Sequence, residues 1–389
     1  MKVLSSFLLA MACGSSFAGD GANSSMLSEP DSGFGWNLSS ISAGAGWRSF
    51  GSLDYKGGTR SQDLYIPSVV GGDALSLPSI GAPGVVGDRT YLNGFVNVDG
   101  SGSADGDTWY WGYDSSGQVS GDVLSFNALG SRSSYSESSD FFGRVTGDDR
   151  LESFSPQVDL LFLPTTPLPK PFEGVLVSFW VFGDDQNHRY SNFTAQQERL
   201  DYRKDFTDQF DIGPINPIID APYAGSFDGP GPLISNLPFD RSEVETLIDR
   251  EDAVFNNSVS TSLDLDGYSL AFGPTMMGRI ADNWSWRASA GLTFNVFKWN
   301  AKESETLSLS IDGGAPTEYR SWRDSKSGSD FRLGVYAKGE MVRDFSNDWF
   351  AKAYFQVEAA ESIDMKIGNS KYEFKPRGYA LGLSLGRKF

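Results

Sequence analysis

Few residues of this chain are of a type that could do chemistry, and the first is its only histidine, His188. It follows Asp184 and Asp185, and an imidazole beside a carboxylate could act as a general base. A catalytic triad, however, needs a nucleophile held in a defined geometry, which a lone histidine does not provide. We therefore interpret His188 as a solvated histidine in a loop and expect no enzyme activity.

A second set consists of three aspartates in a Gly/Ser-rich stretch, Asp99, Asp105 and Asp107. Carboxylates on a flexible loop could hold Ca²⁺, which prefers oxygen ligands. Their spacing differs from that of an EF-hand loop, and Asp beside Gly is typical of polar turns. The sequence thus predicts neither a metal site nor a cofactor.

A third set is charged residues in the C-terminal half, on the polar face of alternating segments. Its members are Arg279, Arg287, Arg332, Lys338, Glu340, Lys352 and Glu358. If these segments are strands of a barrel, the charges point into the lumen, and two interpretations stay open. They line a water path and select small solutes or ions, or they pair across a filled interior.

The elements that would position these charges are strands. From Trp284 to Val296 nearly every second residue is apolar, whereas Arg287 and Thr293 fall on the opposite face, a period of two rather than 3.6. The same alternation covers residues 331–341 and 349–358, which are joined by a short turn at 345–348. These segments are long enough to cross a membrane as antiparallel strands.

Composition points the same way. The chain has 44 Gly, 28 Phe, 15 Tyr and 10 Trp among 389 residues, yet its mean hydropathy is only −0.30. Alternating strands with aromatic girdles and polar loops give this combination. No apolar stretch is long enough for a spanning helix, so an integral protein must be a closed barrel.

Residues 1–18 resemble a secretory leader, with Lys2, an apolar stretch and a small-x-small cleavage site at Ser16-Phe17-Ala18. The only cysteine, Cys13, would leave with it; a lipid anchor on Cys13 fits less well, because Ala10 stands where an aliphatic residue is usual. The mature chain then has 31 basic and 50 acidic residues, a net charge of −19. Such a chain repels nucleic acid.

Residues 19–389 are predicted to form one domain. Weaker strand patterns occur at 91–98, 123–128, 154–163 and 174–182, and residues 213–258 form a long Pro-rich loop with a capping box for a short helix at Ser242–Glu245. The predicted fold is all-β: a closed antiparallel transmembrane β-barrel of about 12 strands, with 10 to 14 acceptable. It has short periplasmic turns at one end and long outer loops at the other.

The last strand carries a resemblance. Tyr379, Leu381, Leu383, Leu385 and the terminal Phe389 share one face, and this ending resembles the insertion signal of bacterial outer-membrane β-barrels. The resemblance implies a location in the outer membrane, with its lipids and the barrel-assembly machinery as partners. The segments 89–96 and 108–113 look like a family signature, to which the sequence alone attaches no activity.

Three functional hypotheses follow. The first is a porin-like passive channel for small solutes or ions, and the second is a non-conducting structural or adhesive barrel that displays long surface loops. The third, a barrel hydrolase around His188, is disfavoured. Outer-membrane phospholipases place a Ser two residues after the His and omptin-type proteases an Asp two residues before it, whereas here those positions are Tyr190 and Gln186.

Overall fold

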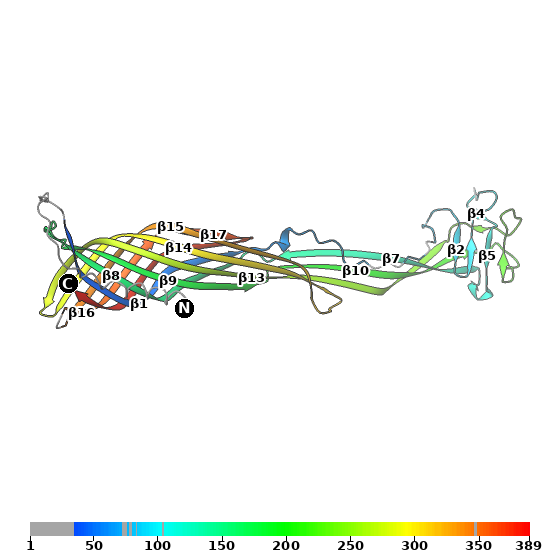
Figure 1. Ribbon diagram of the computed structural model, residues 1–389. Coiled ribbons are helices and arrows are strands. Elements are labelled where there is room, and N and C mark those ends of the chain that lie inside the picture. The colour runs from blue at the N-terminus through cyan, green and yellow to red at the C-terminus, as the bar shows by residue number, and fades with distance from the viewer. Residues whose placement is uncertain (1–34, 72–75, 78–79, 83, 103–104, 346–347) are drawn as a thin grey trace, which may run out of the picture.

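The computed structural model describes residues 35–389, apart from 72–75, 78–79, 83, 103–104 and 346–347. The predicted leader at 1–18, with Cys13, lies outside the described residues. No helix in the described part is long and apolar enough to cross a membrane. The structure is almost entirely antiparallel β-sheet, drawn out into an elongated molecule (Figure 1).

Eight strands form a ring near one end of the molecule. They pair in the order β1 (Trp36–Gly57), β8 (Val145–Pro164), β9 (Gly174–Tyr190), β13 (Asp240–Ala281), β14 (Trp284–Ile311), β15 (Thr317–Asp344), β16 (Trp349–Ala360) and β19 (Arg377–Lys388), and β19 pairs again with β1. All of these pairings are antiparallel.

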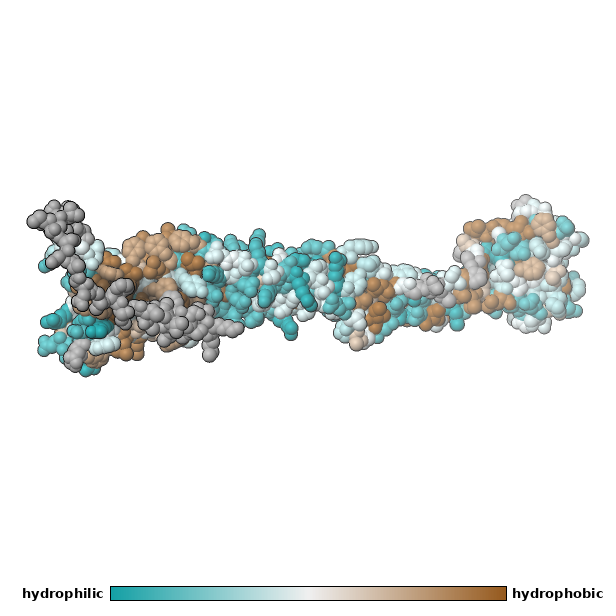
Figure 2. Space-filling model, viewed as in Figure 1, coloured by the Kyte–Doolittle hydropathy of each residue, from teal (hydrophilic) through white to brown (hydrophobic). Residues whose placement is uncertain are grey.

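The alternation in sequence places apolar side chains on the outside of this ring. Register rows such as Phe272–Leu292–Val335 and Trp47–Leu381–Phe355 run across neighbouring strands, and every one of these six side chains is exposed. Figure 2 shows the apolar band at this end of the molecule, with polar residues beyond it. We call this surface the belt.

The belt ends abruptly where polar residues take over the outward positions. On β13, β14 and β15 the last apolar row is Tyr268–Val296–Phe331, and the next outward row is Asp266–Lys298–Ser329. The strands nevertheless continue. Beyond the belt the ring encloses an apolar cluster that includes Phe50, Tyr55, Phe182, Phe297 and Trp299.

A hairpin in the chain between β16 and β19 extends the wall of the ring beyond the belt, beside β1. Its strands are β17 (Ile363–Ile367) and β18 (Ser370–Lys375), and β18 pairs with β1 over Ser52–Lys56, beyond the part of β1 that pairs with β19. Ile363, Met365, Tyr372 and Phe374 from this hairpin are buried in the same apolar cluster.

Farther out, three strands form a stalk. It consists of β7 (Val123–Phe141), β10 (Phe193–Asp211) and the first part of β13, which pairs with β10 up to Asn256 and with β9 from Val259 onward. β13 is 42 residues long. At about 3.3 Å per residue, its part from Asp240 to Asp266 carries the chain on the order of 90 Å beyond the belt.

A small domain, which we call the tip, caps the stalk at the far end of Figure 1. One sheet contains β2 (Arg89–Tyr91), β3 (Gly94–Val96), β5 (Trp111–Tyr113) and β11 (Tyr223–Ala224); a second pairs β4 (Asp107–Thr108) with β12 (Ile234–Ser235). β6 (Val119–Ser120) pairs antiparallel with the start of β7 and follows the 3₁₀ turn η2 (Ser116–Gln118). The other 3₁₀ turn, η1 (Ser61–Asp63), lies on the segment that leaves β1. The tip has its own core around Tyr91, Trp111, Phe126 and Phe210.

Several sequence predictions need correction. The ring has eight strands rather than about twelve, because segments 91–98 and 123–128 belong to the tip and stalk. Residues 240–258 are not loop or helix but the start of β13, since pairing with β10 outweighs the local capping signal at Ser242–Glu245. The outer connections that contain β10 and the outer parts of β13, β14 and β15 are therefore largely β structure, and only residues 212–239 of the predicted loop link strands at the tip.

One buried carboxylate fixes the segment that leaves the ring for the tip. Glu305 of β14 accepts hydrogen bonds from Thr59, the Arg60 amide, Ser61 and Asn257. Burial raises the pKa of this carboxyl, but the hydrogen bonds outweigh burial and hold the pKa below its usual range. Downstream, Ile66 and Val70 pack against Phe255 and Leu307 at the base of the stalk.

We predict that placing Arg at Val335, in the belt, destabilises the ring by about 2–4 kcal/mol. Ser329→Arg, on the same outward face beyond the belt, should change the free energy of unfolding far less. Urea titrations in lipid vesicles measure both. Thr293, on the polar face of β14, is unsuitable as a control position for arginine, because its side chain is buried in the interior. Equal effects at Val335 and Ser329 would contradict the hypothesis that the belt contacts lipid.

A second prediction concerns Glu305. Glu305→Gln should lower the free energy of local opening of residues 59–70 by roughly 1.5–3 kcal/mol, because the acceptor loses its charge. In the wild type the depressed pKa means that this stabilisation is complete above the unfolded pKa of about 4.3 and is lost as the pH falls through the folded value. Hydrogen exchange of residues 59–70 at several pH values tests both statements; protection independent of pH and of the substitution would refute them.

Candidate functional site

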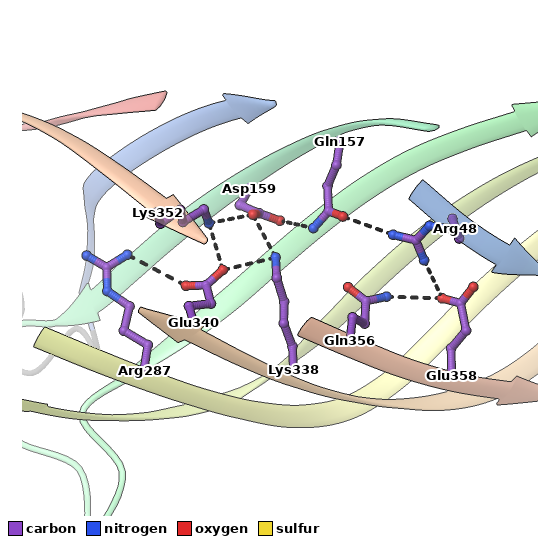
Figure 3. Close-up of polar contacts among 9 residues, drawn as sticks. All are labelled: Arg48, Gln157, Asp159, Arg287, Lys338, Glu340, Lys352, Gln356 and Glu358. Carbon is purple, nitrogen blue, oxygen red and sulfur yellow. Dashed lines mark hydrogen bonds and ion pairs between the residues drawn. The ribbon is translucent and has the colours of Figure 1, made fainter. Parts of the chain in front are cut away.

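The interior of the ring at belt depth is polar, and five strands place charged or amide side chains there. β1 contributes Arg48, β8 contributes Gln157 and Asp159, and β14 contributes Arg287. β15 carries Lys338 and Glu340, and β16 carries Lys352, Gln356 and Glu358. Each side chain is directed inward because its neighbours in sequence occupy the outward face. Figure 3 shows these nine residues as one connected group.

Four of them form a closed ion cluster. Lys338 Nζ lies 2.7 Å from Asp159 Oδ2 and 3.0 Å from Glu340 Oε1. Lys352 Nζ lies 2.5 Å from the same Asp159 oxygen and 2.7 Å from Glu340 Oε1. Each ammonium thus contacts both carboxylates, and all four side chains are at most 2 % exposed. Two bases and two acids leave the cluster neutral.

Amide side chains connect this cluster to a second ion pair. Gln157 donates to Asp159 over 2.8 Å and accepts from Arg48 over 2.9 Å. Arg48 pairs with Glu358 at 2.8 Å, and Gln356 donates to the same carboxylate. The Arg48 guanidinium also lies 4.4 Å from the ring centroid of Trp180, a cation–π distance.

This arrangement fills the cross-section of the ring. An eight-stranded ring has an interior just wide enough for side chains to occupy, and a cavity found beside this network measures about 10 Å³ and is lined by residues such as Phe50, Phe182 and Asn295. That volume admits about one water molecule. Unpaired charges in such an interior would be strongly unfavourable, so each charge in the cluster requires its partner.

The structure brings together five of the seven residues predicted to face a lumen: Arg287, Lys338, Glu340, Lys352 and Glu358. Arg287 lies at the edge of the group, 4.0 Å from Glu340. The other two lie apart from it. Arg332 pairs with Asp330 and bonds the Ser362 carbonyl near the outer end of the belt, and Arg279 is exposed near the turn that follows β13.

Sequence reasoning missed four members of this group, Asp159, Gln157, Arg48 and Gln356. A signal was present for three of them: Gln157 and Asp159 alternate with apolar residues inside the predicted strand at 154–163, and Gln356 does so inside the alternating segment 349–358. Nothing local pairs Asp159 with Lys338, which is 179 positions away. Only the arrangement of strands in the ring shows that Lys338 is the partner of Asp159.

The residues of the predicted insertion signal lie on the last strand of the ring. Leu381, Leu383, Leu385 and Phe389 are exposed outward and Tyr379 is half-buried. β19 pairs with β16 on one side and with β1 on the other. These positions suit a strand that completes the ring, and their role as a signal stays a prediction.

The other candidate residues do not gather into a site. His188 lies on β9 rather than in a loop; its ring stacks on Tyr55 at 4.2 Å, and Nε2 is 3.6 Å from Asp149. Asp99 is buried and accepts hydrogen bonds from Ser101, while Asp107 is exposed on β4. Within the described residues, no three His, Cys, Asp or Glu side chains are grouped to hold a metal ion.

Comparisons with known proteins do not identify a family for this chain. No protein-family model matches the chain, and no curated protein matches it. Among solved structures, the beta domain of the Bordetella autotransporter Brka aligns at 8 % identity over 90 % of this chain and 100 % of that one, with a TM-score of 0.10. Two structures of OmpT of Vibrio cholerae, an outer membrane protein, align at 5 % and 6 % identity over 70 % of this chain and 99 % of theirs, with TM-scores of 0.09 and 0.10. Scores this low carry no argument about fold or function.

The ion cluster makes a third prediction. Asp159→Asn leaves two ammonium groups with Glu340 alone and should destabilise the ring by about 3–5 kcal/mol. The charge-balanced double substitution Asp159→Leu/Lys352→Met should cost much less, because Lys338 and Glu340 stay paired. Asp148→Asn, exposed on the same strand, is the matched control and should change the free energy of unfolding by less than about 0.5 kcal/mol. Equal losses in the single and double variants would show that pairing does not set the cost.

Proposed function

We propose that the chain is a non-conducting barrel of the bacterial outer membrane that displays the stalk and tip away from the membrane. The observation that carries the proposal is the coincidence of two features at one depth. The outside of the ring is an apolar belt, and the inside at the same level is filled by paired charges.

The belt supports membrane insertion. In hydrocarbon every backbone polar group needs a partner within the protein, and a ring of paired strands meets this requirement. On β14 the belt runs from Trp284 to Val296, which is long enough to cross the hydrocarbon core of a bilayer. Trp284, Trp286 and Trp349 lie at the margin of the belt nearer the short turns. The end with the short turns after β13 and β15 faces the periplasm, as in outer-membrane barrels.

The filled interior favours display over transport. A porin-like channel needs a continuous water path, which wide barrels supply and eight-stranded barrels generally do not. Here the inward charges that could line such a path contact one another. The channel hypothesis is therefore the weaker of the two and is decided by a conductance measurement.

The length of the stalk supports the proposal that the barrel displays the tip. A barrel that only anchors itself has no need of strands that extend on the order of 90 Å past a hydrocarbon core of about 30 Å. The tip is also strongly acidic, because residues 80–130 and 206–240 contain eleven Asp but only one Arg and no Lys. Like charge repels the tip from an anionic membrane surface, which favours an outward position.

We predict that the wild-type chain shows no steady single-channel conductance in planar bilayers. Excision of residues 214–238, which link strands only at the tip, should leave both insertion and this absence of conductance unchanged. Asp159→Asn, which opens the ion cluster, is the positive control expected to give transient openings. Steady ohmic channels from the wild type would overturn the display proposal in favour of the porin-like channel.

The orientation makes a further prediction. An epitope inserted at Gly121, in the turn between β6 and β7 of the tip, should be labelled by antibody on intact cells; an added side chain there meets open space. The same epitope inserted between Asp282 and Asn283, in the turn after β13, should be labelled only after the outer membrane is permeabilised. Labelling of both sites on intact cells, or of neither, would contradict the proposed orientation.

A further inference from the structure

The surface of the belt contains a depression, which we call the basin. Two register rows cross it: Met276–Ala288–Gly339–Phe355 and, one step along, Ala290–Ala337–Val357. In each row the outward side chains on β14 and β15 are small, and that on β16 is large. The resulting depression has a volume of about 490 Å³.

Larger residues close the basin along the strands as well. Leu292 and Val335 form the next outward row toward the stalk, and Trp286 and Met341 form the next row toward the periplasmic turns. All four side chains are exposed. The small residues therefore make a bounded hollow rather than a smooth stretch of surface.

Gly339, in the basin, is not required by close contact with another residue of the described structure. A Cβ added at Gly339 would have no atom within 4 Å. A glycine inside a strand weakens the strand and marks a place where a ligand or another backbone approaches closely. No described residue makes that approach, so the space over Gly339 is open to an occupant.

A second depression lies across the Phe355–Val357 ridge and carries a charge. It measures about 470 Å³, and its lining includes Arg377 and Tyr379 at the start of β19, at the end of the belt nearer the stalk. Arg377 has no ion-pair or hydrogen-bond partner among the described residues, whereas Glu358, in the same depression, is neutralised by Arg48. A free guanidinium at the margin of an apolar belt fits a phosphate.

We propose that the two depressions bind one phosphate-bearing membrane lipid, with an acyl chain in the basin over Gly339 and the phosphate on Arg377. The proposal rests on the proposed function, because only a membrane-inserted ring presents this face to lipid. A second copy of the chain would fill the basin but would leave the lone cation at its margin unexplained. Lipid is therefore the occupant to which the geometry points.

The test uses native mass spectrometry on the full mature chain, purified in detergent and delipidated. The added probes are dioleoyl phosphatidylglycerol, dioleoylglycerol and inorganic phosphate. The wild type should retain one phosphatidylglycerol, and both R377E and G339L should lower the bound fraction at least tenfold. Dioleoylglycerol should bind more weakly, in a way that depends on Gly339 but not on Arg377, and inorganic phosphate alone should not be retained.

The matched control is R343E, which makes the same charge change at an exposed outward arginine at the opposite margin of the belt. It should leave lipid binding unchanged; Ala337→Leu replaces G339L if that variant does not assemble. Wild-type binding by both R377E and G339L, or an equal loss in R343E, overturns the proposal. A dimer in the wild type that G339L dissolves also overturns it, in favour of a second copy.

Failure of this inference is distinguishable from failure of the proposed function. Each preparation is first fractionated and checked for the heat-modifiable migration of a folded barrel. A folded barrel in the outer membrane without a lipid adduct refutes the lipid site alone. A wild-type chain that fractionates with the soluble periplasm refutes both.

Discussion

The narrow interior of an eight-stranded ring is the constraint on which the rest of this structure depends. Inward side chains must pack closely against one another, because the interior of an eight-stranded ring is just wide enough for side chains to occupy. The same limit on space holds between adjacent strands: Tyr354 of β16 lies over the next two strands, β19 and β1, at Gly382 and Gly46, whose added Cβ atoms would lie within 3 Å of its hydroxyl. Where charges point inward, Asp159 and Glu340 must each meet both lysines, since an unpaired charge there would be strongly unfavourable.

The same continuity of strands explains the elongated shape. Beyond the belt the interior changes from paired charges to an apolar cluster, and β13 continues from the ring into the stalk without a break. Glu305 and Asn257 lie at this transition: Asn257 accepts hydrogen bonds from the Asn192 and Phe193 amides, where β10 replaces β9, and donates to Glu305. The position of the tip is thus set by paired backbone rather than by a flexible linker.

Period-two patterning predicted the all-β class of the fold and the outward apolar residues of β14, β15, β16 and β19, because one face of each strand is buried and the other is exposed. It did not predict the number of strands. β13 is exposed on both faces from Ser242 to Arg250, so its sequence shows no alternation there, and only its pairing with β10 identifies this stretch as a strand. Alternation along each strand predicted which charged residues point inward. It did not pair Asp159 with Lys338 and Lys352, because only closure of the ring makes these residues neighbours.

Ring closure can be measured directly, because the mature chain is predicted to contain no cysteine. Ala43 on β1 and Leu385 on β19 are register partners across the seam between the first and last strands. The account predicts that Ala43→Cys/Leu385→Cys forms an intramolecular disulfide in the assembled protein, whereas Ala43→Cys/Leu381→Cys, four residues out of register, does not. A reduced Ala43–Leu385 pair in folded protein, or a crosslink only between molecules, would contradict the closed ring.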